Sequence, residues 1–330
     1  MKKKKRLFFT FLFIVLFLVG SFFVDRSVFT SLRDTLVKEG EKALKKIEKK
    51  FNDTDKTKKN SKTNKKIEQT YDIKLTNGLM VFFIDVGQAD AILIKSQDEY
   101  MLIDAGNNED GSKLVDFFKS LNVSELKYVI GTHAHEDHIG GMDNIIRNFK
   151  IDNFYMPNEV TTTQTFLTIL TELGKKKVKF QTPKIGTRLK LGESDVDIVY
   201  VGDNKEDLNA TSIIVKVTYK DTSFLFTGDA PQSEERLMLD KDLKSTVLKV
   251  GHHGSSLSSS QAFLNKVLPE YAVISVGVNN DYHHPHDSVL NRLNKINAKV
   301  YRTDKLGTII ATSNGKEVTF KNIKTDTNGE

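Results

Sequence analysis

The stretch THAHEDHIGG at residues 132–141 follows directly on the apolar run Tyr-Val-Ile at residues 128–130. It places three of the chain's eight histidines within six residues, together with an aspartate. In a loop at a strand end, His133 and His135 point to one side, while Asp137 turns with the third histidine toward a neighbouring point. Two glycines permit a tight turn into the next helix. The stretch therefore predicts ligands for two adjacent cations; the alternative is a chance cluster of surface histidines.

Two later segments supply the ligand types that this stretch lacks. FLFTGD at residues 224–229 is typical of a buried strand that ends in a carboxylate, Asp229, whose two oxygens are able to bridge two cations. LKVGHHGS at residues 248–255 is another apolar strand that ends in imidazoles. Thr-Gly-Asp alone is more often a plain turn, but its combination with the histidine stretch is informative. The three segments together indicate one metal site.

The composition restricts the chemistry of such a site. The chain has no cysteine, which excludes thiolate ligands, cysteine nucleophiles and disulfides, so metal ligands must be His, Asp or Glu. The formal net charge of +6 comes from residues 1–70, which hold 19 basic and 8 acidic residues. Residues 71–330 hold 30 basic and 35 acidic residues, a net charge of −5. The overall charge is therefore no argument for a nucleic-acid partner.

The N-terminal part predicts a membrane anchor. Residues 1–6 are basic, and the uncharged apolar run at residues 7–24 is long enough to span a bilayer. We expect an uncleaved, single-pass anchor in the cell membrane rather than a core helix or a signal peptide, with the following domain outside the cell. Residues 25–51 predict a charged amphipathic stalk, and the polar residues 52–70 a disordered linker.

Residues 71–330 predict one folded domain in which short β-rich runs alternate with amphipathic helices. The early β runs are Met80–Val86, Ala91–Lys95, Tyr100–Ala105 and Lys127–Thr132. Two mixed β halves flanked by helices fit this order. We therefore expect an α/β (α+β) fold, a four-layer αββα sandwich with its sites on loops at the strand ends.

The motifs resemble those of the metallo-β-lactamase superfamily. The resemblance is carried by LIDAG, which ends at Gly106, by HAHEDH, by TGD and by HHGS. More narrowly, the sequence is similar to the soluble hydrolase domain of ComEC-type DNA-uptake proteins through FIDVGQAD (Phe83–Asp90), LKVGHHGS and HPHDSVLNRL (His284–Leu293). The likeness covers roughly Met80–Thr312 and implies the αββα sandwich.

The resemblance also implies a binuclear site. Two histidines of the HAHEDH motif would hold one cation, Asp137 and the third histidine the other, and Asp229 would bridge them. His252 would complete the second site because it is nearer the strand, with His253 as the alternative ligand. The implied metal ligands are His133, His135, Asp137, His138, Asp229 and His252.

Two further residues modify this implied site. Asp104 would orient the histidine loop from behind rather than bind metal. Where much of the superfamily has another histidine, this chain has Asp207–Ser212, which contains none. Three alternatives follow: Asn209 takes that place weakly, the first cation is loosely held, or one cation binds. Zinc is the preferred metal, two ions being expected, with manganese as the alternative.

Divalent cations lower the pKa of bound water from about 16 to about 7, and a second cation polarises the scissile group. Phosphate esters suit such a pair because their non-bridging oxygens are negative. Besides Asp137, we expect His284 and His286 to act in catalysis, by clamping a phosphate or protonating the leaving oxygen, unless they lie in a solvated loop. The expected substrate-binding residues are Gln88, Asp90 and Ser255; burial in turns is the alternative for the first two.

The sequence thus predicts a membrane-anchored, metal-dependent hydrolase outside the cell, with phosphodiesterase or nuclease-like activity. Its expected substrate contains phosphate, single-stranded or double-stranded DNA included. One alternative is an extracellular hydrolase of another ester or amide, such as a choline-phosphate ester or a lactam. The other is a non-catalytic surface module that retains the fold to bind a partner.

Overall fold

The first sheet contains β1 (Leu79–Phe83), β2 (Ala91–Ser96), β3 (Glu99–Ala105), β4 (Glu125–Ile130), β5 (Lys150–Tyr155), β6 (Phe180–Gln181), β14 (Thr308–Ser313) and β15 (Val318–Ile323). Its strand order is β15-β14-β1-β2-β3-β4-β5-β6. The pairs from β3 to β6 are parallel, and the others are antiparallel. The carboxyl ends of β3 and β4 therefore lie at the same edge of this sheet.

The second sheet contains β7 (Arg188–Leu191), β8 (Ser194–Val201), β9 (Ile213–Tyr219), β10 (Thr222–Phe226), β11 (Val247–Lys249), β12 (Tyr271–Ile274) and β13 (Lys299–Arg302). Its order is β13-β12-β11-β10-β9-β8-β7. Strands β10 to β13 run parallel to one another. The ends of β10 and β11, which precede Asp229 and the two histidines of HHGS, are therefore neighbours.

The computed structural model describes residues 73–159, 161–204 and 206–323. The predicted anchor at residues 7–24, the stalk at 25–51 and the linker at 52–70 lie outside these ranges. Within them, no helix combines the length and the apolar character that crossing a membrane requires.

The alternation of apolar residues along β1 shows why the sheets form inner layers. Leu79, Val81 and Phe83 belong to the core between the sheets, whereas Met80 and Phe82 face a second core on the other side. Because successive side chains of a strand point to opposite faces, a strand that is apolar throughout must be covered on both. All five side chains are buried accordingly.

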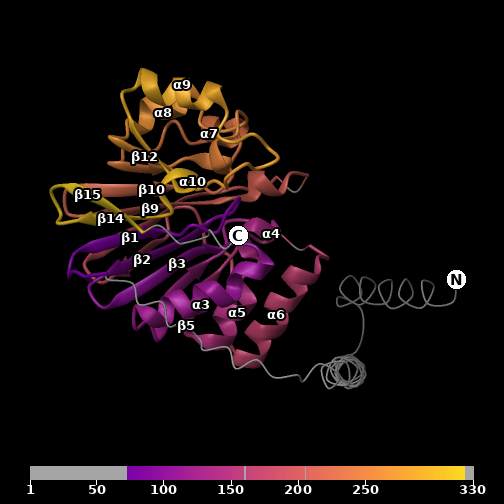
Figure 1. Ribbon diagram of the computed structural model, residues 1–330. Helices are drawn as coiled ribbons and strands as arrows, with labels where there is room; N and C mark the ends of the chain where they lie inside the picture. The colour runs from indigo at the N-terminus through magenta and orange to yellow at the C-terminus, as the bar shows by residue number, and fades with distance from the viewer. Residues whose placement is uncertain (1–72, 160, 205, 324–330) are drawn as a thin grey trace, which may run out of the picture. The chain divides into compact units, whose positions relative to one another are not determined.

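Helices cover the outer faces of both sheets (Figure 1). The first sheet packs against α3 (Gly111–Ser120), α5 (Met142–Asn148) and α6 (Gln164–Lys176). The second packs against α8 (Gln261–Val267) and α9 (Asp287–Lys295), beside α7 (Gln232–Leu237). The short helices α4 (Glu136–Ile139) and α10 (Thr303–Leu306) complete the set in the described residues. The predicted mixed α/β fold with two sheets and outer helices is confirmed.

One predicted boundary was wrong in an informative way. Strand β4 ends at Ile130, before the predicted end at Thr132. The backbone N–H of Thr132 donates to Oδ1 of Asp104 at 2.8 Å instead of to a neighbouring strand. The side chain of Asp104, at the end of β3, therefore binds the first part of the histidine loop and fixes the direction in which this loop leaves β4.

Candidate metal centre

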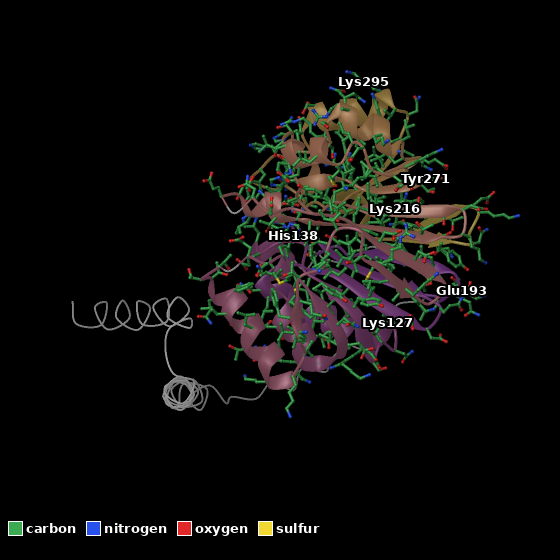
Figure 2. The ribbon with its side chains drawn as sticks, turned by 180° about the vertical axis from the view of Figure 1, so that it is seen from behind. Lys127, His138, Glu193, Lys216, Tyr271 and Lys295 are labelled. Carbon is green, nitrogen blue, oxygen red and sulfur yellow. The ribbon has the colours of Figure 1, made fainter. Side chains whose placement is uncertain are left out.

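The segments that follow β4, β10 and β11 bring four ligand-type side chains together. These side chains are Asp137, His138, Asp229 and His253. One potential ligand atom from each lies within 4.8 Å of the others. Figure 2 shows the buried His138 at the level where the two halves of the domain meet. The site thus combines residues from both halves of the sandwich.

The distances fit a shared cation. His138 Nε2 is 3.3 Å from Asp229 Oδ1 and 3.9 Å from Asp137 Oδ2. His253 Nε2 is 3.3 Å from Asp137 Oδ2 and 3.8 Å from Asp229 Oδ2. Both Nε2 atoms and Asp229 Oδ1 are buried without a hydrogen-bond partner in the structure. Buried polar atoms are rarely left unpaired, and two imidazoles with two carboxylates form a donor set suited to a divalent cation such as zinc.

The electrostatics of the cluster agree with this assignment. Burial alone would lower the pKa of His138, but the carboxylates of Asp229 and Asp104 raise it well above the usual range. Burial would raise the pKa of Asp229, but His138 and His253 hold it well below the usual range. Without a cation, protons on the imidazoles balance the carboxylates. A divalent cation at the same place would replace those protons.

The other ring nitrogen, Nδ1, of both His138 and His253 makes a hydrogen bond that fixes the orientation of the imidazole. His138 Nδ1 lies 2.8 Å from Asp104 Oδ2, and His253 Nδ1 lies 3.0 Å from the carbonyl oxygen of Ser275. Since each Nδ1 donates to an oxygen, each Nε2 is the nitrogen that would bind a cation once its proton has left. Asp104 also accepts from the hydroxyl of Thr132 at 2.7 Å. The structure therefore places Asp104 behind His138 as an orienting residue.

The two histidines expected to hold a first cation are less well assembled. His133 Nε2 and His135 Nδ1 lie 3.0 Å apart. Burial lowers the pKa of His133 well below the usual range. Among the described residues, neither joins a cluster of three or more potential ligands within 4.8 Å. Asn209 lines the same pocket, and its Oδ1 is buried without a hydrogen-bond partner. Of the two expected cation sites, the structure thus assembles only the second among the described residues, the one that contains Asp137, His138 and Asp229.

The structure brings His253, rather than the predicted ligand His252, into the cluster of four. The side chain of His253 is 1% exposed and lies in the cluster, whereas that of His252 is 21% exposed. His252 Nε2 lies 3.6 Å from Asp229 Oδ2, at the edge of the site. Both histidines have φ of 51°, so the chain turns sharply after β11 and the later residue points inward.

Asp90 does not line the pocket mouth, contrary to its predicted role in substrate binding. It is 1% exposed, and its Oδ2 contacts Nζ of Lys249, also 1% exposed, at 2.5 Å. Asp90 Oδ1 is 3.6 Å from His253 Nδ1, and Oδ2 is 3.9 Å from His138 Nδ1. Asp90, Asp104 and His138 also form a group of potential metal ligands. In that group, the carboxylate of Asp90 already has the ammonium group of Lys249 as its partner. This pair joins the two sheets beneath the metal cluster.

Sequence reasoning missed Lys249. It ends β11, a short strand whose three residues are all buried. A lysine is almost never fully buried unless it is paired, so a lysine in an apolar strand beside two histidines was the available signal. Its partner was not deducible, because Asp90 lies 159 residues away in the sequence.

Replacing Lys249 by methionine should lower the free energy of unfolding by about 3–5 kcal/mol, because Asp90 would keep a buried, unpaired charge. Urea denaturation of the metal-free protein measures this change. The double variant Asp90→Asn/Lys249→Met should lose less than the single variant. Lys216→Met is the control, because its partner Asp242 is exposed and the loss should be smaller. Equal losses in all three variants would contradict the pairing.

The remaining predicted residues divide between pocket and scaffold. Gln88 and His284 line the pocket, with Gln88 Nε2 3.4 Å from His284 Nδ1. Ser255 and His286 are not among the residues that line it. Ser255 is buried, and its Oγ accepts from the N–H of Leu257. His286 Nδ1 accepts from the N–H of Ser256 at 2.9 Å. The structure thus gives Ser255 and His286 local hydrogen bonds beside the pocket, and their predicted roles in substrate binding and catalysis stay predictions.

The cluster opens into a pocket of about 320 Å³. Burial, with the nearby charges of His253 and His252, lowers the pKa of His284 to about 4, so this imidazole is neutral at pH 7. The pocket is lined by Gln88, His135, Glu136, Asp137, Asn209, Asp229, His252, His253, Tyr282 and His284. A substrate thus meets imidazoles and carboxylates, with one exposed tyrosine at the side.

Comparison with known proteins places this geometry in a family. The chain is 28% identical over 250 residues to ComE operon protein 3 of Bacillus subtilis, covering 69% of this chain and 32% of that protein. It is 29% identical over 236 residues to the competence protein ComA of Neisseria gonorrhoeae, covering 68% and 31%. The chain spans about a third of the length of these relatives. They confirm the predicted likeness to ComEC-type proteins.

Among solved structures, the metallo-beta-lactamase fold protein YhfI of Bacillus subtilis aligns with a TM-score of 0.49 and 12% identity, covering 74% of this chain and 100% of that one. The model of the metallo-beta-lactamase superfamily matches residues 84–278, more than half of the 330 residues. The matched region contains all four residues of the metal cluster. The chain therefore belongs to the metallo-beta-lactamase superfamily.

Proposed function

We propose that this protein is a metal-dependent phosphodiesterase with a zinc ion, or alternatively manganese, at the cluster of Asp137, His138, Asp229 and His253. The observation that carries the proposal is the convergence of two unpaired imidazole nitrogens and two carboxylates at the base of an open pocket. A bound divalent cation supplies activation of water and offsets the charge of phosphoryl oxygens.

His284 has the features of a donor to the substrate. The Oε1 of Gln88 accepts from the N–H of Gly277 at 3.1 Å, so its amide nitrogen faces His284 Nδ1 and donates to it. The proton of the neutral imidazole then resides on Nε2. Because a pKa of about 4 keeps this ring neutral at pH 7, His284 donates a hydrogen bond to a phosphoryl oxygen without repelling the cation.

Nucleic acid is the phosphodiester that we propose as substrate. The curated relatives include proteins named for competence and for recombination, "Competence protein ComA" and "Recombination protein 2". Such names favour DNA over lactams and choline-phosphate esters. We further propose that residues 7–24 anchor the protein in the cell membrane with the hydrolase domain outside, as their apolar character and flanking charges favour.

Four substrates test the activity. The purified full-length protein, loaded with zinc or manganese, is offered bis-p-nitrophenyl phosphate, single-stranded DNA, double-stranded DNA and nitrocefin. We expect phosphodiester hydrolysis that a chelator abolishes and the metal restores, and no hydrolysis of nitrocefin. A protein that binds metal but cleaves no phosphodiester would refute the proposed activity. It would favour a different ester or amide substrate, or a binding module.

A further inference from the structure

The loop between β12 and α9 holds an exposed tyrosine in a fixed position. Within it, Asn280 Nδ2 donates to the carbonyl oxygens of Gly277 at 3.0 Å and His284 at 2.7 Å. Asn280 Oδ1 accepts from the N–H of His284 at 2.9 Å. Gln88, from the first half of the domain, accepts from the N–H of Gly277. Tyr282 therefore projects from a loop that is closed on itself and tied to the opposite half.

Tyr282 presents one open aromatic face beside the pocket. Its ring stacks on that of His284, with centroids 5.6 Å apart and planes inclined by 22°. The residue is nevertheless 66% exposed, and it lines the pocket together with His284. One face of the phenol ring is thus covered by an imidazole that belongs to the site, while much of the ring meets solvent. This arrangement leaves room for a second planar ring.

The charge of the pocket shows which ligand would need such a surface. Among the described residues, those that line it include no lysine and no arginine. Proteins that hold single-stranded nucleic acid combine a basic groove with aromatic side chains on which bases stack. Where basic residues do not line the pocket, contacts to the phosphate backbone beyond the cation are weak, and stacking must supply more of the affinity. An open tyrosine face next to the cluster meets that requirement.

We propose that Tyr282 is the stacking platform for a nucleobase attached to the phosphodiester bound at the metal cluster. The proposal rests on the proposed phosphodiesterase function and specifies its substrate class as unpaired nucleotides. Within a duplex, each base is stacked on its neighbours, so its face is not free for Tyr282. The geometry therefore selects single strands or frayed ends over intact duplexes.

Binding is tested with a single-stranded oligonucleotide that carries 2-aminopurine, whose fluorescence is quenched by stacking. The full-length, metal-loaded protein should quench it, Tyr282→Ala should bind roughly tenfold more weakly with less quenching, and Tyr282→Phe should retain both. Leu268→Ala removes an exposed apolar side chain elsewhere and is the matched control, expected to behave as wild type. Wild-type affinity and quenching in Tyr282→Ala would overturn the proposal.

Turnover gives a second, independent comparison. The KM for the oligonucleotide should rise roughly tenfold in Tyr282→Ala, and this difference should disappear with an abasic strand of equal length. An equal loss on both strands would overturn stacking, and so would a loss in Tyr282→Phe as large as in Tyr282→Ala, since it would assign the effect to the hydroxyl. If wild type quenches the probe but cleaves no phosphodiester, the proposed activity fails while the base contact stands.

Discussion

Asp229→Ala should lower hydrolysis by about three orders of magnitude, the factor that corresponds to several kcal/mol of transition-state stabilisation by a bound cation. Its Oδ1 lies 3.3 Å from His138 Nε2, and its Oδ2 lies 3.8 Å from His253 Nε2. The side chain is therefore shared by both imidazoles of the cluster. Its removal takes away the carboxylate that would share a cation with both imidazoles.

Activity and metal content measured on the same sample decide this prediction. Asp229→Asn keeps the size of the side chain but removes its charge, so it should also lose the cation. Asp195→Ala is the control, because that aspartate pairs with Lys190 on the surface, away from the pocket. Thermal unfolding establishes that each variant is folded. Full activity in a folded Asp229→Ala protein would remove this residue from the site.

His253→Ala should weaken binding of the cation far more than His252→Ala does. Loss of a direct ligand exceeds the 10- to 100-fold loss of affinity that is typical when a supporting residue is removed. The two histidines are neighbours in the sequence and have the same φ, but they differ in environment. Burial lowers the pKa of His252 despite Asp229 nearby, whereas Asp229 and Asp90 raise that of the buried His253. Of these two neighbours, only His253 has its pKa raised by the surrounding carboxylates despite burial.

Competition with a chromogenic chelator measures both affinities, and the visible spectrum of the cobalt-substituted protein reports the ligand set. His253→Ala should change that spectrum, and His252→Ala should largely preserve it. Each variant serves as the control for the other because they have the same size, charge and chain position. The reverse order of affinities would restore His252 as the ligand and place His253 in a supporting role.

The features that sequence reasoning predicted well are those set by local periodicity. Strand β1 was predictable because it lies in the uninterrupted apolar run at residues 79–84, which requires burial on both faces. Within each sheet the neighbours were predictable: parallel β3 and β4 bring Asp104 beside the histidine loop, and parallel β10 and β11 bring Asp229 beside the HHGS segment. Local periodicity did not show how the two sheets would bring Asp137 and Asp229 together.

The features that it missed depend on backbone turns and on long-range partners. The left-handed turn at His252 and His253 reverses which imidazole faces the site, and periodicity does not encode such a turn. Asp90 is polar and lies in a turn, which is why we expect it to line the pocket from the sequence. In the structure its carboxylate instead contacts Lys249 and is buried. Contacts of this kind are decided by the packing of two sheets, which short sequence windows do not contain.

Whether the cluster binds a metal is tested most directly by the metal content of the purified full-length protein after expression with zinc and manganese. Elemental analysis measures that content, and the affinity of the wild-type protein for the cation is measured beside it. We expect at least one tightly bound divalent cation per chain, held at the cluster of Asp137, His138, Asp229 and His253 and lost when His253 is replaced by alanine. Absence of both metals from the folded wild-type protein, or full retention in His253→Ala, would contradict it.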